Sequence, residues 1–198
     1  MELILASQSP RRKELLDKAG FAFRVVEPDP NAECGICSRE TPPEMVARLA
    51  FQKAQNVVGK VGTGLVLACD TVAECVGVIL GKPKDRDHAR QMLERLRGRQ
   101  HSVYSGICLC HVDSNRHLLR VDVSRLYMEP ISDKELEAYL DTEQWMGKSG
   151  AFGFQDGPPW LDLRDGSPSN VVGLPMELLD NMLDEMETET GERVSRSN

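Results

Sequence analysis

The chain has 198 residues and a mass of 22.1 kDa, with 40% hydrophobic and 28% charged residues. This length predicts one domain or two small lobes, with a core large enough to fold without metal or disulfide staples. The net charge of −7 argues against a nucleic-acid partner, although a few placed cations could still hold a small anion. No window holds the ~18 apolar residues of a membrane span. The apolar run Leu3–Ala6 is too short for a secretory signal, so we expect a cytoplasmic protein without a membrane partner.

The hydrophobic pattern predicts alternating strands and helices. The Ser9-Pro10 pair after the first apolar run is typical of a helix start, and capping boxes begin two later helices at Thr41 and Ser132. In chain order we expect a strand at 3–6, a helix at 9–20, a strand at 21–26, a helix at 41–58, a strand at 65–69 ending at Asp70, a hairpin at 72–80, a helix at 85–96, a long hairpin at 102–128, and helices at 132–140 and 174–186. This order indicates an α/β (α+β) fold around one mixed sheet.

Two stretches depart from the pattern. Residues 147–169 are rich in glycine and proline, which predicts irregular structure. Residues 188–198 are polar, which predicts a disordered tail and leaves 1–187 as a single two-lobed domain.

The first expected helix begins with three cations. Arg11, Arg12 and Lys13 occupy its first turn, where the helix dipole disfavours positive charge by a few tenths to about 1 kcal/mol each. A bound polyanion would reverse that penalty, because helix N-termini offer free N–H groups to anions. The alternative is three solvated cations at the end of a surface helix.

Four further charged residues are candidates for catalysis or ligand binding, although each could instead be structural or simply solvent-exposed. Asp70 follows a buried apolar strand, where a carboxylate must cap, pair or bind a metal. Glu33 lies in a polar loop, Lys53 lies in an otherwise apolar-leaning helix, and Lys82 stands in the rigid Gly-Lys-Pro turn. The chain has no phosphate-binding P-loop, no dinucleotide-binding glycine motif and no serine nucleophile elbow.

The cysteines leave two interpretations open. Cys34 and Cys37 could form half of a zinc site and Cys108 and Cys110 the other half, although their spacings do not match. The simpler interpretation is reduced thiols, because an even count without an export signal does not indicate disulfides.

Taken together, the candidate residues lie in an ordered set of motifs. The opening stretch closely resembles the signature of the Maf family of nucleoside triphosphate pyrophosphatases, and six later stretches match that family in order. The matching stretches are Leu5-Ala6-Ser7-Gln8-Ser9-Pro10-Arg11-Arg12, Glu33, Leu49-Ala50-x-x-Lys53-Ala54, Asp70-Thr71-Val72 with Gly81-Lys82-Pro83, Gly98-Arg99-x-His101-x-Val103, Lys148-x-Gly150-Ala151-Phe152-x-x-Gln155, and Asn170-Val171-Val172-Gly173-Leu174-Pro175.

The resemblance implies a two-lobed fold like that of inosine triphosphate pyrophosphatases, with a central nucleotide cleft. It implies hydrolysis of a nucleoside triphosphate to the monophosphate and pyrophosphate with Mg²⁺ or Mn²⁺, in a possible homodimer. By the same resemblance, Glu33 and Asp70 would hold the metal and Asp70 would also accept the proton from water. The residues that would bind the phosphates are Ser9, Arg12, Lys53 and Lys82.

Three positions mark the family's substrate branches. Arg11, Thr71 and Gln155 resemble the branch that acts on dTTP and UTP, and a glutamine amide can both donate to and accept from a pyrimidine imide. The chain departs from the family pattern at Gly147, Ser149 and Pro158-Pro159-Trp160 around Gln155, and at Cys34–Cys37 after Glu33. The alternative function is a non-catalytic nucleotide-binding regulator of cell division.

Overall fold

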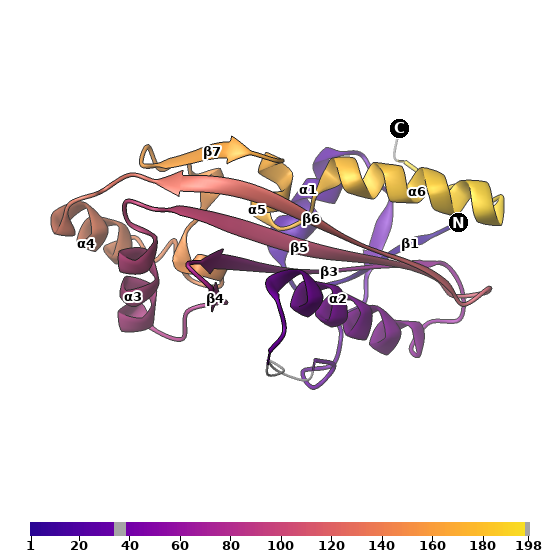
Figure 1. Ribbon diagram of the computed structural model, residues 1–198. Helices are drawn as coiled ribbons and strands as arrows, with labels where there is room; N and C mark the ends of the chain where they lie inside the picture. Colours follow the sequence, from indigo (N-terminus) through magenta and orange to yellow (C-terminus); the bar gives the residue numbers. More distant parts are fainter. Residues whose placement is uncertain (34–38, 197–198) are drawn as a thin grey trace. The chain divides into compact units, whose positions relative to one another are not determined.

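The structure is a computed structural model that describes residues 1–33 and 39–196. Its elements are, in chain order (Figure 1), β1 (Leu3–Ala6), α1 (Pro10–Lys18), β2 (Phe23–Val25), α2 (Pro42–Val58), β3 (Leu65–Cys75), β4 (Val78–Leu80), α3 (Arg86–Leu96), β5 (Gln100–His111), β6 (Arg116–Met128), α4 (Asp133–Asp141), the short 3₁₀ helices η1 (Ser149–Ala151) and η2 (Phe154–Asp156), β7 (Leu161–Asp165), α5 (Pro168–Val172) and α6 (Met176–Thr190).

The strands form one mixed sheet. Its order is β2-β1-β3-β5-β6-β7, and β4 pairs with β3 outside this path. Strand β1 is parallel to both β2 and β3, whereas β4 is antiparallel to β3 and β7 is antiparallel to β6. The predicted α/β class with a mixed sheet is confirmed.

The chain divides into two compact units. Unit 1 comprises Met1–Asp70, Ser105–Asp122 and Gly173–Asn198, and unit 2 comprises Thr71–Tyr104 and Val123–Val172. Strand β3 therefore passes from unit 1 to unit 2 between Asp70 and Thr71. Each unit has its own apolar core, since the buried clusters contain residues of one unit only.

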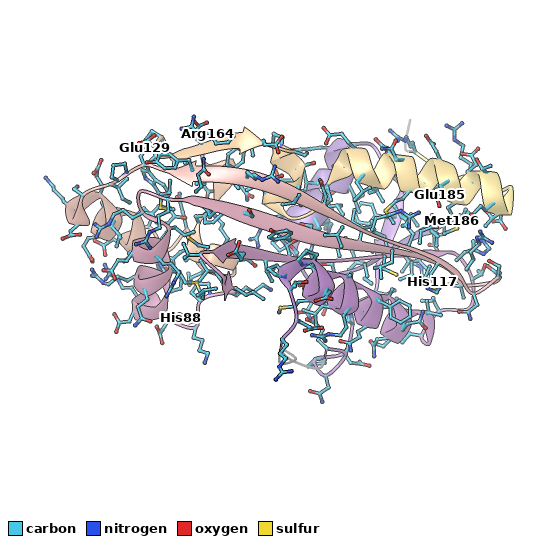
Figure 2. The ribbon with its side chains drawn as sticks, viewed as in Figure 1. His88, His117, Glu129, Arg164, Glu185 and Met186 are labelled. Atoms are coloured by element: carbon cyan, nitrogen blue, oxygen red, sulfur yellow. The ribbon has the colours of Figure 1, made fainter. Side chains whose placement is uncertain are left out.

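In unit 1 helices cover both faces of the sheet. Leu3 and Leu5 pack with α1 and α6, while Ile4 and Ala6 on the opposite face pack with α2. Burial on both faces explains why β1 is continuously apolar rather than alternating. Two neighbouring residues of α6, Glu185 and Met186, are labelled in Figure 2. Met186 is fully buried, while the adjacent Glu185 pairs with Arg120 of β6 at 3.1 Å.

In unit 2 helices α3 and α4 supply the core. Ala89, Met92, Leu93 and Leu96 of α3 are buried at helical spacing, as the sequence predicts. They pack in one cluster with buried side chains of α4 and of the strand segments in this unit. Trp145, just after α4, is also buried and donates its indole N–H to Leu140 O at 2.9 Å.

Strand β3 differs from the prediction. We expected a strand to end at Asp70 and a separate hairpin strand to begin at Val72, but one strand runs from Leu65 to Cys75. The carboxylate does not interrupt the strand because its side chain pairs with Lys53, so no strand end is needed to solvate it.

The C-terminal third is more ordered than the sequence indicates. The stretch expected to be irregular contains β7 and α5, which are only five residues each and too short to show a clear periodic signal. Helix α6 continues to Thr190, beyond the predicted start of a disordered tail. The following residues also make contacts, since Ala22 N–H donates to Ser195 O at 3.2 Å and Arg196 pairs with Asp180 at 2.7 Å. No helix in the described part of the chain is long and apolar enough to cross a membrane.

Candidate active site

The N-terminus of α1 has the features expected of an anion site. Within the described first turn of α1 there is no acidic residue, Pro10 occupies the start, and the Ser9 side chain makes no capping hydrogen bond to the helix. The Ser9 backbone N–H instead donates to Ser7 Oγ at 3.1 Å. The positive end of the helix dipole is therefore not compensated by a side-chain carboxylate of its own first turn.

Arg12 is not a solvated surface cation, which was the alternative interpretation of the first turn of α1. It is 9% exposed, its Nε donates to Gly173 O at 2.8 Å, and its Nη1 donates to Ser7 Oγ at 3.2 Å. Cys69 Sγ also donates to Gly173 O, at 3.2 Å. Arg12 thus links the start of α1 to the segment before α6, and it has a structural role in unit 1 whatever else it binds.

Lys53, Glu33 and Asp70 form a compact cluster, called here the carboxylate cluster. Lys53 Nζ lies 2.5 Å from Asp70 Oδ1 and 3.1 Å from Glu33 Oε1. The side chains of Lys53 and Asp70 are only 12% and 13% exposed, while Glu33 is 39% exposed. Two carboxylates thus converge on one cation beside the middle of a largely buried strand.

Local packing positions each member of this cluster. Lys53 projects from α2 at the margin of its buried face, where Ala50, Ala54 and Val57 pack against the sheet. Asp70 is held in the middle of β3.

On both sides of Glu33, the loop that carries it makes polar contacts with α2 or with a residue just beyond that helix. Before Glu33, Asp29 accepts hydrogen bonds from Lys60 Nζ and Asn56 Nδ2, both at 2.9 Å. These two bonds lower the pKa of the Asp29 carboxyl. After Glu33, Glu40 forms a two-point ion pair with Arg48. The described residues before and after Glu33 are thus both tied to α2 or to Lys60 just beyond it.

Unit 2 brings together the second group of predicted site residues. Ser149 Oγ donates to Thr71 O at 2.7 Å, and Gly150 N–H donates to Gly81 O at 3.1 Å. The exposed Lys82 follows Gly81 directly, and the exposed Gln155 lies on η2 of the same loop as Ser149. The loop at 147–157, called here the recognition loop, is therefore anchored beside Thr71 and Lys82.

The predicted residues fall into two groups by unit. Ser9, Arg11, Arg12, Glu33, Lys53 and Asp70 belong to unit 1, and Thr71, Lys82 and Gln155 belong to unit 2. The contacts described above join Glu33, Lys53 and Asp70 directly. Arg12 is directed at Gly173 O and Ser7 Oγ.

Sequence reasoning missed the residues that hold these groups in place. The carbonyl of Gly173 as the partner of Arg12 carries no side-chain signal. The ion pair between Lys148 and Asp156 in the recognition loop joins two residues that the sequence analysis left without a role. Gly153, which lies between Lys148 and Asp156 in the sequence, is the residue that could have indicated this ion pair, because a side chain there would occupy the same space.

The zinc hypothesis gains no support from the described residues. Cys34 and Cys37 lie outside them. Cys108 and Cys110 are buried free thiols, and burial raises the pKa of Cys108 to about 12 and also raises that of Cys110. Zinc takes thiolates, which these sites disfavour. Among the residues that the structure describes, no group of three or more His, Cys, Asp or Glu could hold a metal.

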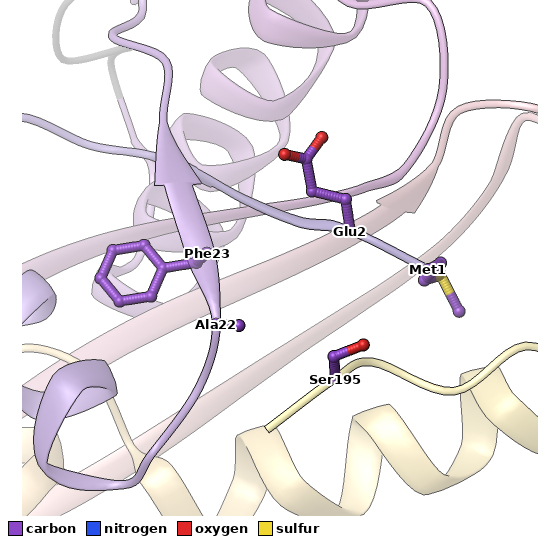
Figure 3. A pocket seen from close by; sticks show the side chains of 5 residues that line it. All are labelled: Met1, Glu2, Ala22, Phe23 and Ser195. Carbon is purple, nitrogen blue, oxygen red and sulfur yellow. The ribbon is translucent and has the colours of Figure 1, made fainter. Parts of the chain in front are cut away.

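A pocket of about 380 Å³ in unit 1 lies apart from these residues (Figure 3). It is lined by Met1, Glu2, Ala22, Phe23 and Ser195. The N-terminal amine at its edge already donates to Arg193 O at 2.6 Å, and the lining side chains add a carboxylate rather than a cation. This lining does not suit a triphosphate.

Known structures define the class of fold. A HAM1 protein from Coxiella burnetii has a TM-score of 0.53 to this chain at 16% sequence identity, and the match covers 93% of this chain and 99% of that one. At this identity the likeness shows the fold alone.

Sequence relatives define the family more narrowly. Residues 2–186 match the family described as Maf-like protein, and the chain belongs to that family. A relative from Rhodopirellula baltica, named dTTP/UTP pyrophosphatase, is 54% identical over 186 residues, which are 93% of this chain and 82% of that protein. A relative of the same name from Carboxydothermus hydrogenoformans is 38% identical over 180 residues, covering 90% of this chain and 95% of that protein. The family resemblance expected from the motifs is confirmed.

The burial of Arg12 leads to a stability prediction. Arg12→Ala should lower the free energy of unfolding by about 1.5–3 kcal/mol, because it removes two hydrogen bonds from a buried, charged donor. Lys13→Ala, an exposed position in the same helical turn, is the matched control and should change it by less than about 0.5 kcal/mol. Urea unfolding of both variants measures the difference. Equal stability of the two variants would show that the Arg12 contacts do not support the fold.

Proposed function

We propose that this chain hydrolyses nucleoside triphosphates to the monophosphate and pyrophosphate, prefers dTTP and UTP, and thereby removes unwanted nucleotides from the precursor pool. The observation that carries the proposal is the carboxylate cluster, in which Asp70 is 13% exposed and paired with Lys53. The names of the relatives, dTTP/UTP pyrophosphatase, support the substrate class. A nucleotide is thus the partner we assign. We expect the reaction to take place in the cytoplasm, and a homodimer stays a prediction for light scattering to test.

The chemistry assigns Asp70 the role of general base. The oxygen of a water molecule attacks the α-phosphorus, the bond from that phosphorus to the oxygen of the leaving pyrophosphate breaks, and Asp70 takes the proton from the water. Negative charge grows on the phosphoryl oxygens during this step, so cations placed in advance lower its barrier. In this proposal Lys53, Arg12 and Lys82 supply positive charge to the triphosphate, and Ser9 donates a hydrogen bond.

Glu33 and Asp70 are suited to hold a divalent cation. Both carboxylates already converge on one positive centre, Lys53 Nζ, within 3.1 Å. Two carboxylates, with substrate phosphates and water completing the shell, are the ligand set typical of Mg²⁺, and Mn²⁺ accepts the same oxygens. The bound cation would neutralise phosphate oxygens. Lys53 would keep the two carboxylates together before substrate and metal bind.

The recognition loop and its anchors supply the base preference. Gln155 is exposed at the tip of the loop, and its amide can donate one hydrogen bond and accept another. The imide of uracil and thymine presents the complementary N–H and carbonyl, whereas adenine presents a different pattern. Together with Thr71 and Arg11, this side chain would leave polar groups unpaired on the wrong base, which disfavours it.

The role of Asp70 can be tested by removing its charge. Asp70→Asn should reduce kcat for pyrophosphate release by roughly 10²–10⁴, the usual contribution of a positioned base. Because Asp70 pairs with the buried Lys53, activity should be expressed per folded molecule. The control is Asp184→Asn on the exposed side of α6, which should keep normal turnover. Nucleotide binding without any pyrophosphate release in the unaltered protein would favour the alternative, a non-catalytic nucleotide-binding regulator of cell division.

The metal proposal predicts a shift in cation dependence. Chelation should abolish turnover, and Mg²⁺ or Mn²⁺ should restore it. Glu33→Gln should raise the cation concentration needed for half-maximal activity by at least about tenfold, since even outer-sphere changes cost about 10- to 100-fold in metal affinity. Full activity of the chelated protein would contradict the assignment of Glu33 and Asp70 as ligands.

The base preference predicts a ranking of substrates. Values of kcat/KM for dTTP and UTP should exceed those for ATP and GTP, and Gln155→Glu should lower the dTTP value by roughly tenfold or more, because a carboxylate loses the donor of the amide. Gln144→Glu, another exposed glutamine of unit 2, is the matched control and should leave the ranking unchanged. Equal kcat/KM for ATP and dTTP in the unaltered protein would refute the assigned preference.

A further inference from the structure

The recognition loop carries an ion pair that the proposed chemistry does not use. The ammonium of Lys148 pairs with Asp156, and the two side chains are only 12% and 21% exposed. Gln155 directly precedes Asp156 in the chain and is itself exposed. The two neighbours therefore differ in surroundings, with Asp156 directed back to Lys148 and Gln155 open to solvent.

The backbone of this turn is shaped around the ion pair. Asp156 N–H donates to Gly153 O at 3.2 Å, and Gly157 N–H donates to Phe154 O at 3.1 Å with Gly157 at a φ of 66°. A Cβ atom on Gly153 would overlap both the Asp156 carboxylate and the Lys148 ammonium. The ion pair thus occupies the space that any other residue at 153 would need.

A second anchor lies behind the same turn. Tyr139 of α4 is 8% exposed, and its hydroxyl accepts a hydrogen bond from Gly153 N–H at 3.0 Å. Its ring packs edge-on against Trp160 with centroids 5.1 Å apart. Burial raises the pKa of Tyr139 to about 12, and the nearby Asp156 charge adds to that rise, so the hydroxyl stays neutral at physiological pH.

These contacts fix the chain on both sides of Gln155. Two residues before Gln155, Gly153 donates its N–H to Tyr139. One residue after Gln155, Asp156 pairs with Lys148. Exposed loops otherwise tend to be mobile, and a mobile amide loses orientational selectivity because it can pair with several bases. Because the two side chains are shielded more than the turn around them, removing one partner leaves the other with less solvent to compensate its charge.

We propose that the Lys148–Asp156 ion pair is a positioning element for Gln155, which it holds in the orientation that distinguishes a pyrimidine imide from the adenine edge. The inference rests on the proposed function, because it concerns selectivity at the same nucleotide site. Lys148 and Asp156 are positioning residues: they act on base selection by orienting Gln155 and do not contact the base themselves.

The test measures binding selectivity without turnover. The probes are the α,β-imido analogues of dUTP and ATP, titrated calorimetrically with Mg²⁺ present. Lys148→Met and Asp156→Asn should each reduce the ratio of the two affinities about tenfold, whereas Lys148→Arg should keep most of it. In a Gln155→Ala background the same changes should cause no further loss of selectivity. A purely structural role would predict equal losses in both backgrounds.

A matched control separates this effect from the loss of any ion pair. Arg125 and Asp165 form an exposed pair in the same unit, 63% and 62% exposed, and Asp165→Asn should leave the affinity ratio unchanged. If thermal melting shows that Lys148→Met does not fold, Asp156→Asn keeps the test open, because it preserves side-chain size at a partly exposed position.

Three outcomes separate the positioning role of the ion pair from the proposed pyrophosphate hydrolysis. Loss of selectivity that depends on Gln155 supports the positioning role. Unchanged affinity ratios in folded variants, or equal losses with and without Gln155, overturn it and leave pyrophosphate hydrolysis standing. Selective binding by the unaltered protein with no pyrophosphate release contradicts the hydrolysis proposal, while the same titrations still decide the role of the ion pair.

Discussion

The contact between Lys53 and Asp70 is the interaction on which the rest of the candidate site depends. An acid in the middle of a buried strand is costly unless a counter-charge meets it, and the ammonium of Lys53 does so at 2.5 Å. With the charge compensated, β3 continues past Asp70 into unit 2, so that Thr71 follows in the same strand. The same ammonium draws in Glu33 and makes a pair of carboxylates out of two residues far apart in sequence.

Arg12 stabilises the fold, although its position at a helix N-terminus suggests that it binds an anionic ligand. A helix N-terminus disfavours positive charge, and a solvated arginine there would gain little. In the structure its guanidinium is buried and bound to the carbonyl of Gly173, which also accepts the thiol of Cys69. Three segments distant in the sequence are therefore joined at one backbone oxygen. Binding of a triphosphate near α1 would act on a side chain that already stabilises unit 1.

The recognition loop uses a different means of pre-organisation. It has little regular structure, being two single-turn 3₁₀ helices, yet it is attached at Thr71 O, Gly81 O and the Tyr139 hydroxyl. Side-chain and backbone hydrogen bonds thus replace the ladder of a strand or helix. Such a loop can change its exposed residues without disturbing the core beneath, which suits a position that chooses among bases.

The sequence by itself determined the fold class, most helix starts and the identity of the candidate residues. Those features depend on local patterns: apolar periodicity, capping boxes at Thr41 and Ser132, and ordered motifs around Asp70 and Gln155. Only the tertiary structure decided that β3 continues through Asp70 and that Arg12 is buried, and only it revealed that Lys148 meets Asp156. The first two depend on a partner that is distant in sequence or on a backbone carbonyl, and the third depends on a loop conformation that no periodic pattern predicts. A charged residue looks the same in a sequence whether water or a buried counter-charge solvates it, and only the packed chain settles which of the two is present.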